Sequence, residues 1–175
     1  MKKVKVATVW LDGCSGCHMS FLDMDAAIIS LAQKIDLVYG PLVDAQEFPG
    51  EVDVTLVEGA VSSEEDLHKI QMIRQRTGVL IALGDCAVTG NVPAMRNNIP
   101  VTRMLQQVYV EGSSHGKAVP TEGVPQLLRQ ARPLREFVTV DMALPGCPPP
   151  AKAIVGVVTA LLEGRKPEAM AVKFG

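Results

Sequence analysis

Short apolar runs rich in β-branched residues recur along the chain and predict the strands of a buried sheet. Each run is bounded by turn residues and is apolar almost without interruption, which is typical of parallel strands that are covered on both faces. The predicted strands span residues 4–10, 35–39, 52–57, 79–83 and 137–140.

Segments with helical periodicity lie between these runs. We predict helices over residues 18–33, 63–76 and 151–163. Ser62 and Ser63 supply caps for the second helix, with Glu65 three residues after Ser62 as in a capping box. The third helix follows a proline run and ends at Gly164. Alternating strands and helices predict an α/β fold of the flavodoxin-like class, an open parallel sheet with helices on both faces.

The first predicted helix has a wide apolar surface. Phe21, Met24, Ile28 and Leu31 form one row, and Leu22, Ala26 and Ile29 form a second row beside it. Together the two rows cover more of the circumference than one sheet contact needs, so they predict a surface for a partner. The alternative is a fully internal helix.

Between Gly90 and Pro133 the periodicity is lost, and glycine, proline and asparagine punctuate the chain. We therefore predict one domain over residues 1–175 with a long irregular connection at about 91–133. A connection of this length is usually functional or an interface. Its excess of basic residues is equally typical of a solvated rim.

Composition excludes several classes of protein. Hydrophobic residues make up 47% and charged residues 21%, which excludes a disordered chain. A net charge of −2 and 4% aromatic residues argue against nucleic-acid binding. No apolar run approaches the roughly 20 residues of a membrane span. The basic start is followed by an apolar stretch that stops at Asp12, too short for a signal peptide. We expect a soluble cytoplasmic protein.

Four cysteines carry the candidate chemistry: Cys14, Cys17, Cys86 and Cys147. In a reducing compartment, metal binding or redox duty is the favoured role for such residues. The first two follow the first predicted strand, and the others follow the fourth and fifth. Because the carboxyl ends of parallel strands form the ligand-binding edge of an open sheet, we expect the four thiols to converge there. Such a set binds either one zinc ion or one iron–sulfur cluster.

The surroundings of the cysteines favour the cluster. A zinc ribbon offers a second C-x2-C pair, and this chain has only one. Gly13 and Gly16 let backbone N–H groups approach sulfur, which raises the potential of a cluster. The three prolines that follow Cys147 remove N–H donors and prepare the turn into the last helix.

Three motifs in this order resemble the small subunit of [NiFe] hydrogenases: Val-Trp-Leu-Asp-Gly-Cys-Ser-Gly-Cys-His at 9–18, Gly-Asp-Cys-Ala-Val-Thr-Gly-Asn-Val-Pro at 84–93 and Leu-Pro-Gly-Cys-Pro-Pro at 144–149. The resemblance covers nearly the whole chain and is strongest to the NAD-reducing (bidirectional, soluble) branch. We expect no twin-arginine leader and no cysteine-rich C-terminal domain. The related quinone-reductase subunit of complex I has adjacent cysteines where this chain has C-x2-C.

The resemblance implies that Cys14, Cys17, Cys86 and Cys147 ligate one [4Fe–4S] cluster. It implies a Ni–Fe centre in a partner large subunit, so this chain is a subunit of the enzyme and is not catalytic alone. Electrons would pass toward diaphorase subunits that carry flavin and iron–sulfur clusters and reduce NAD⁺. The branch also suggests an FMN near the cluster, although we find no specific flavin motif in the sequence.

Other polar residues near the predicted site have individual interpretations. Glu58 ends the third strand and is a candidate proton relay or partner contact, or else a loop acid bonded to amides. His18 adjoins Cys17 and fits a structural hydrogen bond best, with donation to a sulfide as the alternative. Asp12 and Asp85 precede ligands and suit turns. Trp10 is expected to pack beneath the loop.

Three alternative functions remain. The first is a structural zinc module that acts as an interaction scaffold. The second is a thiol–disulfide oxidoreductase that uses Cys14 and Cys17, which leaves Cys86 and Cys147 unexplained. The third is the small subunit of a related complex I-like oxidoreductase whose partner reacts with quinone or another acceptor.

Overall fold

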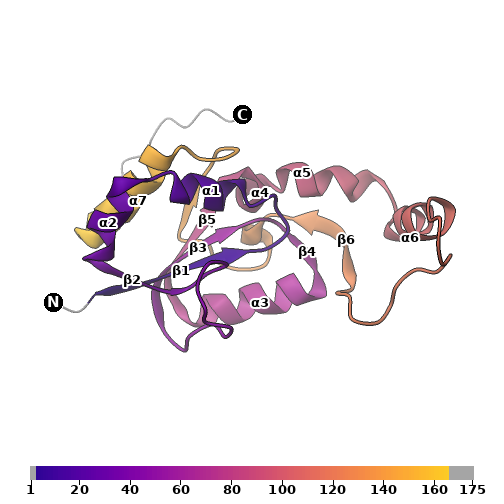
Figure 1. The fold of residues 1–175 in the computed structure, drawn as a ribbon, viewed down its shortest axis with the longest axis horizontal. Helices are drawn as coiled ribbons and strands as arrows, with labels where there is room; N and C mark the ends of the chain where they lie inside the picture. Colours follow the sequence, from indigo (N-terminus) through magenta and orange to yellow (C-terminus); the bar gives the residue numbers. More distant parts are fainter. Residues whose placement is uncertain (1–2, 166–175) are drawn as a thin grey trace.

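The computed structural model describes residues 3–165 and is built on a parallel five-stranded sheet (Figure 1). The strands lie in the order β2-β1-β3-β5-β7, and every neighbouring pair in this sheet is parallel. This is the flavodoxin-like order, with its switch point between β1 and β3. The structure thus confirms the predicted fold class. The strand bounds are β1 (Val4–Trp10), β2 (Ile35–Tyr39), β3 (Val52–Glu58), β5 (Thr77–Leu83) and β7 (Met142–Leu144).

Helices cover both faces of the sheet, because the sheet residues are apolar on both sides. Helices α1 (Gly16–Leu22), α2 (Ala26–Ala32) and α7 (Ala151–Leu162) lie on one face, and α3 (Glu64–Gln75) lies on the other (Figure 1). Leu56 and Ile81 face the first layer, whereas Val57 and Leu80 face the second. No helix within residues 3–165 is long and apolar enough to cross a membrane.

The predicted helix over residues 18–33 is in fact two helices. The chain leaves α1 at Asp23 and reaches Asp25 with a φ of 48° before α2 begins. Aspartate adopts positive φ more readily than most residues, which explains why the break falls here. Met24 is buried between the two helices, whereas Ile29 and Leu22 are exposed. The second apolar row is therefore not internal.

The other predicted helices are nearly correct. Helix α3 begins one residue later than predicted, and its capping box joins Ser63 to Asp66 rather than Ser62 to Glu65. Asp66 lies at the third position after the cap, where its carboxylate accepts the Ser63 N–H at 3.0 Å. Helix α7 ends at Leu162, close to the predicted residue 163.

The predicted strand over residues 137–140 is wrong. A 3-10 turn, η3 (Leu134–Glu136), precedes this segment, and Phe137, Val138 and Val140 pack against the core without pairing in the sheet. Pairing starts at Asp141, whose N–H donates to Leu80 O at 3.0 Å, and continues in β7. The apolar residues are thus explained by packing, which periodicity alone does not distinguish from a strand.

The segment at 91–133 is more ordered than predicted. It contains α5 (Asn91–Ala94), η1 (Met95–Asn98), α6 (Val101–Gln106), η2 (Gln107–Glu111) and β6 (Leu127–Arg132). Strand β6 pairs antiparallel with β4 (Val61–Ser63) in a second, two-stranded sheet. Arg96 and Asn97 fix this sheet through their side chains: the Arg96 guanidinium donates to Ser62 O, and the Asn97 amide bonds both backbone groups of Ala131. Figure 1 shows α6 at the end of the molecule opposite α2 and α7.

Asp141 links the edge strand β7 to the body of the fold and makes stability depend on pH. Burial raises the pKa of Asp141, but the Leu80 N–H and the Arg74 guanidinium outweigh that effect and hold the pKa below its ordinary value. A carboxyl with a depressed folded-state pKa stabilises the fold above its unfolded pKa of about 3.9, and this contribution is lost as pH falls through the folded-state pKa.

We therefore expect Asp141→Asn to lower the melting temperature at pH 7 by about 2–4 °C, the shift for about 1 kcal/mol in a domain of this size. The difference from wild type shrinks as pH falls below about 4. Thermal unfolding across this pH range measures it, with the exposed Asp36→Asn as the control. A deficit that is the same at every pH would contradict the assignment.

Candidate functional site

The four cysteines lie on three segments at one edge of the sheet. Cys14 follows β1, and Cys17 is in the first turn of α1. Cys86 is in α4 (Gly84–Thr89), which directly follows β5, and Cys147 follows β7 by three residues. Because β1, β5 and β7 are parallel, these positions all lie at the carboxyl edge, as predicted.

The four thiols are near enough to influence one another electrostatically. Burial raises the pKa of the Cys17 thiol, and the negative charges of Glu58 and of the other three thiolates raise it further. Burial also raises the pKa of Cys86, with contributions from Cys147 and Cys14, while the Val92 N–H that faces its sulfur works in the opposite direction. Four thiols whose charged forms repel one another favour a positively charged occupant, which would deprotonate and bind all of them.

Two hydrogen bonds between Asp85 and Gly146 tie the segments of Cys86 and Cys147 together. The Asp85 carboxylate accepts the Gly146 N–H at 2.7 Å, and the Asp85 N–H donates to Gly146 O at 2.9 Å. On the other side, the Ser20 hydroxyl of α1 donates to Pro149 O at 2.5 Å. These bonds hold the Cys147 segment against both α4 and α1. Asp85 thus has the structural role predicted for it.

The segment before Cys14 is held by the end of β3. Leu11 N–H donates to Glu58 O at 2.9 Å, and Asp12 exchanges two backbone hydrogen bonds with Ala60 at 2.8 and 3.1 Å. Gly59 permits this approach, because it has a φ of 95° and a Cβ there would lie 2.7 Å from the Leu11 carbonyl carbon. Trp10 ends β1 as predicted, but it is 45% exposed and does not pack beneath the loop; its Nε1–H donates to Gly13 O at 3.1 Å.

Glu58 and His18 form a buried, hydrogen-bonded pair, and His18 directly follows Cys17 in α1. Glu58 Oε2 lies 2.5 Å from His18 Nδ1 and also accepts the His18 backbone N–H at 3.0 Å. Both side chains are less than one-tenth exposed. The structural hydrogen bond expected of His18 is confirmed, and its partner is Glu58. A proton-relay role for Glu58 stays a prediction.

Two polar contacts to sulfur are not evident from the residue pattern. The Val92 N–H faces the sulfur of Cys86, and Asn91 Nδ2 donates to Cys147 Sγ at 3.5 Å. Asn91, which follows Gly90, has a φ of 30°. The chain therefore bends sharply after α4, and both donors face the cysteines. The Gly-Asn pair in the sequence is the signal that could have indicated this bend. Hydrogen bonds to sulfur are a recurrent feature of iron–sulfur sites.

Gly84 provides the space in which the Cys17 thiol lies. A Cβ at this residue would lie 2.2 Å from Cys17 Sγ and 3.4 Å from Gly146 O. The φ of 82° at Gly84 also belongs to the region that favours glycine. Gly84 therefore keeps the segments of Cys17, Cys86 and Cys147 close together.

The donor set fits a cluster better than a single ion. Four thiolates around one zinc at about 2.3 Å would lie about 3.8 Å from one another. Within residues 3–165, no three His, Cys, Asp or Glu side chains gather closely enough to hold one metal ion. The four thiols nevertheless interact with one another. The four thiols, with the Val92 N–H and the Asn91 side-chain amide directed at sulfur, are compatible with a [4Fe–4S] cluster.

Apolar side chains are exposed on α1 and on the elements that precede Cys14 and follow Cys86 in the chain. We define the exposed apolar patch as Trp10, Met19, Leu22, Val92 and Met95. Cys14 and Cys147 are themselves exposed. Several exposed apolar side chains near a functional site are typical of a surface that another protein covers.

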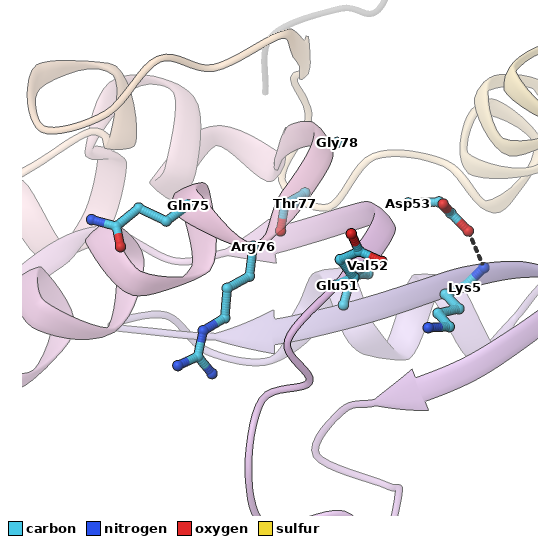
Figure 2. A pocket seen from close by; sticks show the side chains of 8 residues that line it. All are labelled: Lys5, Glu51, Val52, Asp53, Gln75, Arg76, Thr77 and Gly78. Carbon is cyan, nitrogen blue, oxygen red and sulfur yellow. Dashed lines mark hydrogen bonds between the residues drawn. The ribbon is translucent and has the colours of Figure 1, made fainter.

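A polar pocket lies at the opposite edge of the sheet (Figure 2). It is formed at the amino ends of β1, β3 and β5, where Lys5 and Arg76 lie among Glu51 and Asp53. Asp53 Oδ2 accepts the Lys5 backbone N–H at 2.7 Å. This pocket contains no sulfur ligand and does not contribute to the cysteine site.

Removal of the Asp85 carboxylate should loosen the cysteine site. In Asp85→Ala the buried Gly146 N–H loses its acceptor, and we expect a loss of about 2 kcal/mol in the free energy of unfolding. Denaturant unfolding measures this value. Asp85→Asn keeps an acceptor oxygen and should retain most of the stability, so equal losses in the two variants would contradict the role given to this hydrogen bond.

Comparisons with known proteins agree with this geometry. Residues 14–161 match the family described as NADH ubiquinone oxidoreductase, 20 Kd subunit. The chain is 39% identical over 168 residues to the delta subunit of the NAD-reducing hydrogenase HoxS of Cupriavidus necator, covering 93% of this chain and 80% of that protein. It is 38% identical over 167 residues to one subunit of the F420-non-reducing hydrogenase vhu of Methanocaldococcus jannaschii, covering 94% of this chain and only 58% of the relative.

A solved structure shares the whole fold. One chain of an NAD⁺-reducing [NiFe]-hydrogenase in the H2-reduced state superposes with a TM-score of 0.94 and 39% identity, covering 99% of this chain and 100% of that chain. The predicted resemblance is thereby confirmed. The protein belongs to the NADH ubiquinone oxidoreductase 20 kDa subunit family and, within it, to the hydrogenase subunits.

Proposed function

We propose that this chain is the electron-transfer small subunit of an NAD-reducing [NiFe] hydrogenase and holds one [4Fe–4S] cluster through Cys14, Cys17, Cys86 and Cys147. The observation that carries the proposal is the convergence of these four thiols at one sheet edge in a hydrogenase-subunit fold. When bound, the cluster accepts and releases single electrons.

The residues of this chain supply the binding site and control its surroundings. Cys17 is buried and Cys86 is half-buried, whereas Cys14 and Cys147 are exposed. Asp85, Ser20 and the backbone around Asp12 hold the three cysteine segments in place. The exposed side of the site faces the partner in this proposal, so that water is excluded only in the complex.

We assign the exposed apolar patch to the interface with a hydrogenase large subunit, which holds the Ni–Fe centre. This chain is not expected to cleave hydrogen alone, because its cysteines are committed to the cluster. The second apolar row predicted on the first helix is exposed at Leu22 and Ile29, and these residues extend the surface available to a partner.

The names of the similar proteins do not agree on one electron acceptor, so the extent of each match decides which acceptor we favour. The chain spans 80% of an NAD-reducing hydrogenase subunit but only 58% of an F420-non-reducing one, and the family description names a ubiquinone oxidoreductase. We favour NAD⁺ through a diaphorase module, because the structural match to a chain of an NAD⁺-reducing enzyme covers both chains almost completely.

Hydrogen-dependent reduction of alternative acceptors tests this proposal. The complex is isolated anaerobically through a tag on this chain and supplied with hydrogen and either NAD⁺, F420 or a soluble quinone. We expect NADH formation. Reduction of quinone or F420 without NADH would place the chain in a related oxidoreductase, and failure to recover a hydrogenase large subunit would overturn the proposal.

The flavin and zinc hypotheses have less support. In flavodoxin-like folds FMN binds at the β1/β3 switch point. Here Cys14, Cys17 and Glu58 lie at that point, and the sequence offers no specific flavin motif there. The single-ion geometry that zinc needs is missing among residues 3–165.

A further inference from the structure

One short turn after α4 places two hydrogen-bond donors against two of the cysteines. Asn91 Nδ2 donates to Cys147 Sγ at 3.5 Å, a hydrogen-bond distance for an acceptor atom as large as sulfur. The backbone N–H of the next residue, Val92, faces the sulfur of Cys86 and opposes the rise in pKa that burial imposes on that thiol. The turn therefore contacts cysteines on two different segments, one in α4 and one after β7.

The backbone of this turn directs the Asn91 side chain. Gly90 ends α4 with a φ of 93°, and its N–H donates to Cys86 O at 3.0 Å. A Cβ on Gly90 would lie only 3.1 Å from Ala94 Cβ, so a larger residue would crowd α5. Asn91 has a φ of 30°, in the left-handed region that asparagine adopts more readily than most residues. Its backbone preference and its contact with sulfur are thus separate properties, which different substitutions can distinguish.

Contacts on both sides hold the turn against the rest of the fold. Before the turn, the Arg135 guanidinium donates to Val88 O at 3.2 Å. After it, the Asn97 side chain donates to Ala131 O and accepts the Ala131 N–H, both at 2.8 Å. The amide of Asn91 is therefore carried by a segment that is fixed at each end. A donor that is positioned in advance needs little reorganisation when the charge of its acceptor changes.

The chemistry of sulfur selects the amide nitrogen as the contacting atom. A cysteine that binds a metal is a thiolate, which has no proton and therefore only accepts hydrogen bonds. Of the two ends of the Asn91 amide, only the NH2 group can donate to it. A donor interacts more strongly with the more negative state of its acceptor, so this hydrogen bond favours the reduced state of a cluster held by Cys147.

We propose that Asn91 raises the reduction potential of the cluster, because its side-chain amide donates a hydrogen bond to the sulfur of the ligand Cys147. Asn91 acts through Cys147 and does not itself bind iron, so it is a positioning residue. This inference rests on the proposed function, since it requires a cluster on the four cysteines.

The reduction potential distinguishes this role from a purely structural one. Asn91→Gly removes the donor but tolerates the positive φ, because glycine adopts that conformation freely. We expect reduction to be disfavoured about fivefold, which lowers the potential by about 41 mV at about 59 mV per tenfold change. Asn91→Asp also tolerates the φ and replaces the donor with a negative charge, so its potential should be lower still. EPR-monitored redox titration of the anaerobic complexes measures all three, and equal potentials in wild type and Asn91→Gly would overturn the inference.

Magnetic resonance tests the contact in the wild-type complex. The complex is labelled with asparagine that carries ¹⁵N in its side-chain amide, reduced with dithionite and examined by pulsed EPR for nitrogen coupling to the cluster. We expect a ¹⁵N coupling that disappears in Asn91→Gly and in Asn91→Asp. Asn98→Ala, an exchange at an exposed residue at the end of η1, should keep both the coupling and the wild-type potential. No coupling in wild type, or an unchanged coupling in Asn91→Gly, would overturn the proposal.

The outcomes distinguish this inference from the proposed function. If the wild-type complex contains no iron and sulfide that Cys147→Ala loses, the proposed function itself fails. If every Asn91 variant keeps its iron but the couplings and potentials equal those of wild type, only the role of Asn91 fails. If Asn91→Gly does not assemble, the labelled wild-type and Asn91→Asp complexes still decide the question.

Discussion

Cys147→Ala is expected to abolish the cluster while leaving the polypeptide folded. Cys147 is exposed and lies outside the core, so its substitution should change the free energy of unfolding of the metal-free chain by no more than about 0.5 kcal/mol. The cluster, in contrast, loses one of its four ligands. Bound iron should fall from about four atoms per chain, and the EPR signal of the reduced cluster should disappear.

Hydrogen-dependent reduction of NAD⁺ by the complex should disappear together with that signal. The matched control is Ser113→Ala, an exchange in the loop that follows η2. The Ser113 hydroxyl has His115 O as its one hydrogen-bond partner within residues 3–165. A Cys147→Ala complex that kept its full iron content and spectrum would contradict the proposed ligand set, because Cys147 would then not be a ligand.

Gly84→Ala should lower the iron content nearly as much as Cys147→Ala does, although glycine contributes no side chain to the site. The added Cβ would lie 2.2 Å from Cys17 Sγ, so either the thiol or the start of α4 must move. The positive φ adds a strain of about 1–2 kcal/mol. We expect at least about 2 kcal/mol of lost stability. We also expect loss of the cluster, because Cys17 and Cys86 can no longer approach as they do.

Gly123→Ala separates the steric effect from the backbone strain. Gly123 has a similar φ of 70°, but nothing lies within 4 Å of a Cβ placed there. This variant should show only the strain and retain its iron. Iron analysis and denaturant unfolding of both variants measure the two effects, and equal iron loss in both would contradict the steric role of Gly84.

The sequence predicts the sheet and the position of the cysteines because both follow from local pattern. Continuous apolar runs identify β1, β2, β3 and β5 to within a few residues. The cysteines come directly after strands, and parallel topology then brings residues 14, 86 and 147 to the same edge. No knowledge of distant contacts is needed for these conclusions.

The errors arise where distant contacts decide the outcome. Residues 137–140 are apolar because Phe137, Val138 and Val140 pack on the core, and the sheet is instead completed by β7. Strand β6 exists because it pairs with β4, and the paired residues Ser63 and Leu127 are far apart in the chain. The Leu-Leu-Arg-Gln-Ala-Arg sequence of β6 does not indicate this partner. Periodicity cannot reveal either contact.

The cysteine site shows the same division between local pattern and distant contact. His18 and Glu58 are recognisable in the sequence as polar residues beside the cysteines, but only the fold shows that they contact each other across 40 residues. Asn91 approaches Cys147, and Gly84 makes room for Cys17, through loops that meet only in three dimensions. The chemistry of single residues can therefore be predicted from the sequence, whereas the contacts between them cannot.

The most direct test of the central claim is the iron, acid-labile sulfide and zinc content of the complex, isolated anaerobically, together with EPR spectra before and after reduction by dithionite. The Cys147→Ala complex, measured in parallel, identifies the metal bound by this chain. We predict a difference of about four iron and four sulfide and a reduced-cluster signal that only the wild type shows. A difference of one zinc, with identical EPR spectra, would contradict an electron-transfer role for this subunit.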